Sequence, residues 1–92
     1  QIETIGYFNG QNIKSIIIKN GIKGIRNYSF ESVPLTTITI PKSITDIGYG
    51  AFSKCSLKTV NYEGSEEDWK AINIEEDNDA LINAKINYNY KE

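Results

Sequence analysis

The sequence predicts an α/β solenoid, a short right-handed stack of coils whose equivalent strands run parallel. One apolar cluster recurs at a 22-residue step, as Ile13, Ile16 and Ile18, then Leu35, Ile38 and Ile40, then Leu57, Val60 and Tyr62. A second cluster follows the same step, as Ile22, Ile25 and Phe30 and then Ile44, Ile47 and Phe52. Repeats of about 20–29 residues are typical of solenoids, in which each coil buries its apolar face against the next.

The first cluster of each repeat predicts a strand. In residues 35–40, apolar side chains alternate with threonine toward the end of the cluster, as they do in a strand with one buried face. The β-branched residues Ile38, Thr39 and Ile40 suit a pleated surface. Residues 16–18 and 57–62 occupy the equivalent positions, so we expect these strands to pair in parallel.

The second cluster predicts a short extended segment followed by a helical or 3₁₀ turn. Within residues 44–52, Ala51 and Phe52 would point this turn inward. Phe8, Phe30 and Phe52 share the repeat step and would form an aromatic spine. Stacked aromatic pairs contribute about 0.5–1.5 kcal/mol beyond their burial.

Two corners connect the clusters. Asn20-Gly21 is typical of a hairpin turn, but both flanking segments recur at the repeat step, which favours a corner of a coil. Glycine at this corner can adopt a positive φ. Pro41-Lys42 occupies the same corner one repeat later, where proline ends the strand because it has no N–H to donate.

Residues 1–62 are therefore predicted to form three repeats, the first of them two residues short between Gly6 and Phe8. The first repeat has no polar capping element. We expect its apolar layer either to be covered by other parts of a longer protein, of which this chain is a fragment, or to self-associate. Residues 63–92 break the period and are predicted to cap the other end of the same single domain.

The capping segment begins with a helix signal. Ser65 is the predicted N-cap and Asp68 its capping-box partner, and Trp69 and Ile72 share one face of the helix. A second short helix is predicted over residues 79–83. A final strand is predicted over residues 86–90, where apolar and aromatic residues alternate with asparagine.

Composition excludes several classes of function. The chain has no histidine and one cysteine, which removes the commonest general base and any internal disulfide. There is no glycine-rich phosphate loop, Ser/Lys constellation or basic stripe interleaved with aromatics, so we expect no catalysis, no cofactor and no nucleic-acid partner. No apolar run reaches the roughly 18 residues that span a bilayer. The formal charge is +4 over residues 1–62 and −6 over residues 63–92, which indicates a solvated acidic cap or, alternatively, a means of orienting a partner.

For two local groups of residues, a chemical role is the alternative to a structural one. Cys55 could be a reactive thiol, but its repeat partner is Val33, so a buried structural cysteine is the favoured interpretation. The acidic segment 75–79 offers oxygen ligands for calcium, but the EF-hand spacing is absent beyond the fragment Asp77-x-Asp79. A solvated loop with a helix N-cap is favoured, and no metal site is predicted.

The repeat pattern resembles a known family. Residues 44–55 have the pattern I-x-x-I-G-x-x-A-F-x-x-C, and residues 57–62 have the pattern L-x-x-V-x-Y. With the tail that begins Tyr62-Glu63-Gly64-Ser65, they resemble the BspA-like leucine-rich repeats and their C-terminal cap. The resemblance implies a leucine-rich-repeat fold, an extracellular or cell-surface location in bacteria, and adhesion to host matrix or cell-surface proteins. The chain departs from the pattern in its shortened first repeat and in Gln11 and Val33 at the cysteine position.

The exposed face of the parallel sheet is the predicted binding site. Because alternate side chains of a strand point to opposite faces, the neighbours of the buried clusters form a hydroxyl-rich, weakly basic surface made of Lys14, Ser15, Ile17, Thr37, Thr39, Lys58, Thr59 and Asn61. Solenoids bind partners on such extended surfaces, but β-propensity alone also explains threonine there. Protein binding and a passive spacer that carries another domain both remain open.

Overall fold

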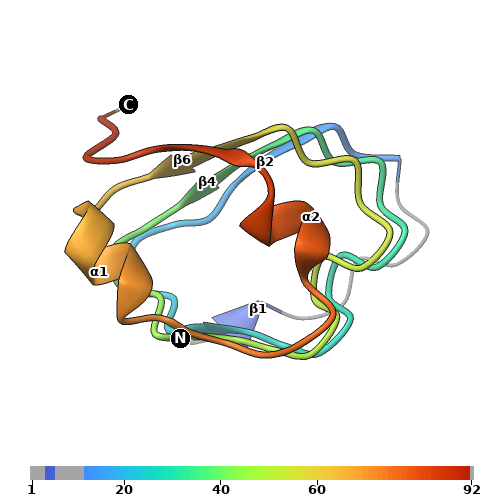
Figure 1. Cartoon of the computed structure of the whole chain (residues 1–92), viewed down its shortest axis with the longest axis horizontal. Coiled ribbons are helices and arrows are strands. Elements are labelled where there is room, and N and C mark those ends of the chain that lie inside the picture. Colours follow the sequence, from blue (N-terminus) through green and yellow to red (C-terminus); the bar gives the residue numbers. More distant parts are fainter. Residues whose placement is uncertain (1–3, 6–11, 92) are drawn as a thin grey trace.

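The computed structural model describes residues 4–5 and 12–91, and these form a stack of coils (Figure 1). Its strands make two four-stranded parallel sheets on opposite sides of the core. The β1 sheet has the order β1-β3-β5-β7, with strands Thr4–Ile5, Gly24–Ile25, Asp46–Ile47 and Asn73–Ile74. The β2 sheet has the order β2-β4-β6-β8, with strands Ser15–Ile17, Thr37–Ile40, Thr59–Tyr62 and Lys85–Asn87. Helices α1 (Glu66–Lys70) and α2 (Asp79–Ile82) belong to the last coil.

The strand register confirms the 22-residue repeat. Thr37 pairs with Ser15 on one side and with Thr59 on the other. In the β1 sheet, Ile25 pairs with Ile47 at the same step. Like segments of successive coils therefore stack directly, as the periodic sequence predicts.

The last coil adds a strand to each sheet at a longer step. Asn73 pairs with Asp46, 27 residues earlier, and Lys85 pairs with Thr59 at the 26-residue offset that also separates Asn87 from Asn61. The added length is occupied by α1. The repeat pattern does not predict β7, because the inserted helix displaces this strand from the 22-residue step.

The core fills the space between the two sheets. Phe30 and Phe52 stack with their ring centroids 5.3 Å apart and an interplanar angle of 20°, as expected for the aromatic spine. Phe8, its predicted third member, lies outside the described residues. Residues 1–3 and 6–11 of the first repeat, on which the expected self-association depends, also lie outside them. The largest fully buried side chains come from both sheets and their turns, and they include Leu35, Ile38, Ile40, Ile47, Val60, Tyr62 and Leu81.

The segment that follows β5 is a series of tight turns without a continuous helix. Ala51 N donates to Gly48 O, and Ser53 N donates to Gly50 O, which is the i to i+3 pattern of a 3₁₀ turn. Gly50 and Lys54 both have a φ of 60°. These left-handed residues interrupt the helical path, so the predicted helical turn is limited to isolated 3₁₀-type bonds.

The Asn20-Gly21 corner is a turn within a coil, and no hairpin forms there. Gly21 has a φ of 103°, and its N–H donates to Ser43 Oγ at 2.9 Å. The Ser43 hydroxyl donates in turn to the Ile22 carbonyl at 2.7 Å. One hydroxyl of the next coil thus satisfies two backbone groups of this corner.

The predicted capping box at Ser65 is confirmed. Asp68 N donates to Ser65 Oγ at 3.1 Å, and Ser65 N donates to Asp68 Oδ2 at 3.0 Å, which completes a capping box. Trp69 of α1 is buried and meets Tyr62 edge-on, with ring centroids 5.0 Å apart. Helix α1 is therefore fixed to the end of β6 by both capping and aromatic packing.

The end of the chain differs from the prediction. Strand β8 covers Lys85–Asn87, whereas a strand was expected over residues 86–90. Asn89 has a φ of 55°, which is outside the range of strands, and its N–H donates to the Gly64 carbonyl at 2.8 Å. The alternation of side chains continues through a turn here, so pattern alone overestimates the strand. Helix α2 ends at Ile82, close to the predicted residues 79–83.

Candidate protein-binding surface

The outward side chains of the β2 sheet form two columns across the four strands. The first column consists of Ser15, Thr37, Thr59 and Lys85. The second consists of Ile17, Thr39, Asn61 and Asn87. We call these two columns, together with Lys14 and Lys58 at the starts of β2 and β6, the β2 face. The alternate side chains of the two middle strands are almost fully buried, which agrees with the predicted inward positions of Ile38, Ile40, Val60 and Tyr62.

The predicted site residues differ in exposure. Lys14, Ser15 and Lys58 are exposed, whereas Thr37 and Thr59 are half-buried. Thr39 departs from the prediction, because it is only 4% exposed although it belongs to an outward column. It is flanked in register by Ile17 and Asn61. Thr39 therefore offers little surface to a partner.

The second column has one apolar and one polar end. Ile17 is 51% exposed and lies on β2, at the edge of the sheet. At the other end, Asn87 Nδ2 donates to Asn61 Oδ1 at 2.9 Å. Part of the hydrogen-bonding capacity of Asn61 is thus used within the sheet.

Lysine is the dominant charge on this sheet. The segments that contain its strands and their flanks are residues 12–19, 34–41, 56–62 and 83–91, and they hold five lysines and no aspartate or glutamate. Lys85 belongs to the face but is absent from the predicted site, because β8 lies off the 22-residue step. The inward-pointing Ile86 is the sequence signal that could have placed Lys85 on the outer side.

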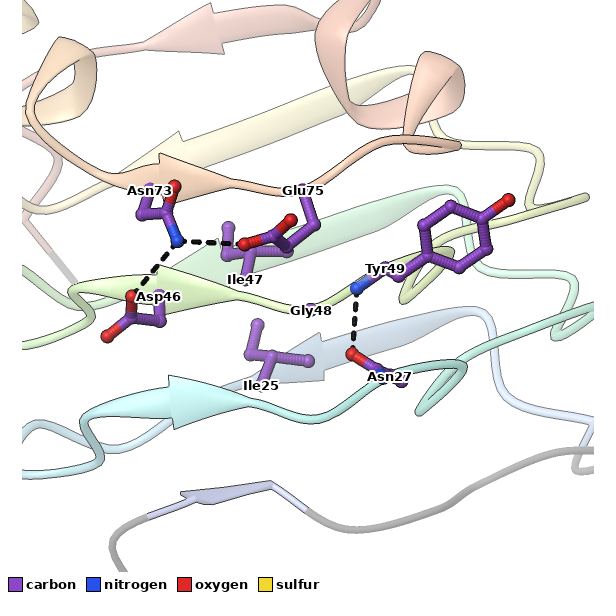
Figure 2. Close-up of a pocket in the computed structure, with 8 residues that line it drawn as sticks. All are labelled: Ile25, Asn27, Asp46, Ile47, Gly48, Tyr49, Asn73 and Glu75. Carbon is purple, nitrogen blue, oxygen red and sulfur yellow. Dashed lines mark hydrogen bonds between the residues drawn. The ribbon is translucent and has the colours of Figure 1, made fainter.

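A shallow polar groove of about 360 Å³ lies on the β1 sheet (Figure 2). Asn73 Nδ2 donates to Asp46 Oδ1 at 3.3 Å and to Glu75 Oε2 at 3.0 Å. The backbone N–H of Tyr49 donates to Asn27 Oδ1 at 2.9 Å. The Asn73–Asp46 and Tyr49–Asn27 bonds each join one coil to the next, so polar groups in this groove serve the stacking of the coils.

Asn78 is a buried polar residue whose role sequence reasoning missed. It precedes α2 but makes no side-chain capping bond, in contrast to the predicted solvated loop with an N-cap. It is 2% exposed. Its Nδ2 donates to the carbonyls of Gly48 at 3.0 Å and Glu75 at 2.9 Å, and its Oδ1 accepts from Phe52 N at 2.9 Å. The side chain therefore fastens the last coil to the one before it.

Cys55, the cysteine considered above as a reactive thiol, has a structural environment. Cys55 packs against the core, and its thiol donates to the Phe30 carbonyl at 2.9 Å. Burial raises the pKa of the Cys55 thiol to about 11, which keeps it protonated and unreactive at neutral pH. In the part of the chain that the structure describes, no three His, Cys, Asp or Glu side chains are grouped so that they could hold a metal ion. Across the same residues, no helix is long and apolar enough to cross a membrane.

Comparison with protein families agrees with this geometry. Residues 2–88 match the BspA type leucine rich repeat region, in six copies. The chain belongs to the BspA-type leucine-rich repeat family. No curated protein and no solved structure gives a significant match. BspA-type repeats are generally protein-binding and typically non-catalytic, and the family is generally associated with bacterial surfaces.

Proposed function

We propose that this BspA-type module is a non-enzymatic adhesion module of a bacterial surface or secreted protein, and that it binds a protein partner through the β2 face. The observation that carries the proposal is the composition of this face. Its outward positions hold hydroxyls, lysines and the exposed Ile17, all on a rigid parallel sheet. Such a surface can donate hydrogen bonds to a partner and attract its negatively charged groups, while the sheet holds the strands in place.

The width of the face limits how much of an interface it provides. Four strands span about 15 Å at the usual spacing of about 4.8 Å. A standard interface buries about 800 Å² on each partner. The module on its own therefore supplies only part of a standard interface.

The second column supports a competing function, that of a passive spacer and cap. Thr39 is buried, and Asn61 and Asn87 bond to each other, so these side chains serve the sheet itself. Residues 63–92 would then act mainly to close the stack through α1. In this case the β2 face binds nothing.

A substitution that changes the shape of the β2 face but not its charge distinguishes between the two functions. Thr37→Tyr adds bulk at the centre of the first column without changing charge, and Thr45→Tyr adds the same group at an exposed position before β5 as a matched control. Binding to immobilised fibronectin, laminin and collagen and to epithelial cells is measured by interferometry and cell attachment. We expect Thr37→Tyr to weaken a wild-type interaction at least tenfold, and Thr45→Tyr to leave it within about twofold. Equal binding by all three proteins would move the site off the β2 face, and no binding by any would favour the spacer.

A further inference from the structure

The charges of this protein are segregated between its two sheets. The β2 sheet segments carry five lysines and no carboxylate. The β1 sheet segments, residues 22–27, 44–49 and 72–79, carry five carboxylates and two basic side chains. The whole chain has a formal charge of −2, so the positive face does not follow from a basic composition.

Three lysines of the β2 face lie near the starts of its strands, in two adjacent rows. Lys14 and Lys58 precede β2 and β6, whereas Lys85 lies one row further along and pairs with Thr59. Thr36 N donates to Lys14 O and Lys58 N donates to Thr36 O, both at 2.9 Å, and Lys85 N donates to Lys58 O at 3.0 Å. These backbone bonds place the starts of β2, β4, β6 and β8 side by side. At a strand spacing of about 4.8 Å, the backbones of Lys14 and Lys58 lie roughly 10 Å apart, and Lys85 is on the strand next to Lys58.

These lysines have no carboxylate partner within the described residues. The salt bridges found there join Lys42 to Asp68 and Lys70 to Glu66. Lys14, Lys58 and Lys85 take part in neither bridge and are exposed. Their charges are therefore available to a partner and are not used to stabilise the fold.

We infer that the β2 face takes an extended acidic segment of a protein partner, whose carboxylates pair with Lys14, Lys58 and Lys85. This inference rests on the proposed function and adds the chemistry of the partner to it. Thr37 and Thr59 lie in the same column as Lys85 and can hydrogen-bond the partner's backbone. The 51% exposed Ile17 supplies an apolar contact.

The mixture of contacts favours a polypeptide over an anionic polysaccharide. The lysines lie only near the starts of the strands, and neutral Thr36 separates Lys14 from Lys58. The rest of the face is hydroxyl, amide and aliphatic surface, which suits a segment that carries both acidic and apolar side chains. Exposed ion pairs are individually weak and are screened by salt, so binding should weaken as the ionic strength rises.

A selection experiment tests the charge of the partner without assuming its sequence. The 92-residue chain is used to select from a library of random 12-residue displayed peptides. Selected peptides are synthesised, and their binding is measured by fluorescence anisotropy at low and high salt. The face variant carries Lys58→Glu and Lys85→Glu, and the matched control carries Lys23→Glu and Lys54→Glu, two exposed lysines outside the β2 face with the same change in net charge. Circular dichroism confirms that both variants are folded.

The expected result is enrichment of aspartate and glutamate in the selected peptides. The face variant should lose their binding by about fivefold or more, because two exposed attractions become repulsions, while the control stays within twofold. Selected peptides without acidic enrichment, or equal losses in the two variants, would overturn the inference. Heparin that binds the wild type tightly and displaces the peptides, with its own binding lost in the face variant, would overturn it in favour of a polysaccharide.

The test also separates this inference from the proposed function. If non-acidic peptides are selected and Thr37→Tyr abolishes their binding while the lysine changes do not, the β2 face binds proteins and only the acidic partner is wrong. If no selected peptide responds to Thr37→Tyr or to the lysine changes, both the inference and the proposed site are wrong.

Discussion

Replacing Asn78 with alanine should destabilise the fold strongly. The side chain makes hydrogen bonds of 2.9–3.0 Å with the backbone groups of Gly48, Glu75 and Phe52. At 2% exposure, water has little access to replace them. Each such bond contributes about 0.5–1.5 kcal/mol, and each buried group left without a partner costs about 1–3 kcal/mol. We expect a loss of about 3 kcal/mol, a large share of the roughly 5–15 kcal/mol that stabilises a typical domain.

Urea unfolding followed by circular dichroism measures this loss. Asn83→Ala is the matched control, because Asn83 is an exposed asparagine at the other end of α2. Substitution at an exposed position of this kind should change the free energy of unfolding by less than about 0.5 kcal/mol. A loss from Asn78→Ala as small as that of the control would refute the proposed link between the last two coils.

Asn78→Asp tests the direction of the hydrogen bonds. The introduced carboxylate can accept from Phe52 N but cannot donate to the carbonyls of Gly48 and Glu75. Repulsion from these carbonyls should raise the pKa of the new carboxyl above its unfolded value of about 3.9. The stability of the variant should therefore be closest to that of the wild type below about pH 3.9, where the carboxyl is protonated in both states. The variant should lose stability as the pH rises from there through the folded pKa. A difference from the wild type in the free energy of unfolding that does not change with pH would contradict this assignment of donors.

Three further substitutions test the turns and the cap. A Cβ added at Gly48 would lie 2.5 Å from Asn27 Oδ1, 2.6 Å from Asn27 N and 2.8 Å from the Arg26 carbonyl carbon, so Gly48→Ala should cost about 1–3 kcal/mol. Because the last two contacts are with backbone, adding Asn27→Ala should not restore stability in urea unfolding. Recovery would show that the Asn27 side chain is the obstacle. Ser65→Ala should cost about 1 kcal/mol through loss of the cap. The Ser65 backbone N–H holds the pKa of Asp68 below its ordinary 3.8, so the Asp68 contribution is complete above that pH and is lost as the pH falls through the lower pKa. Asp68→Asn should therefore lower the melting temperature at pH 7, and this effect should shrink as the pH is lowered below 3.8. An effect that does not change with pH would contradict the capping role.

The candidate surface was predictable where the 22-residue step applies. Ser15, Thr37 and Thr59 fall in one outward column because identical offsets place them on neighbouring strands. The step fails at Lys85, since the inserted α1 shifts the last coil to a 26-residue offset. Thr39 shows a second limit of prediction from the sequence. The alternation of residues gives the direction of a side chain but not how closely its neighbours cover it.

The sequence by itself determined the solenoid, its parallel register and the stacking of Phe30 on Phe52. A periodic apolar pattern is enough for this, because each coil needs only the equivalent residues of the next coil to bury its inner face. Only the tertiary structure decided the roles of Asn78 and β7. Asn78 reaches Phe52 and Gly48 across 26 and 30 residues, off the repeat step, and its donors and acceptors find partners only once the last coil has closed over the one before it.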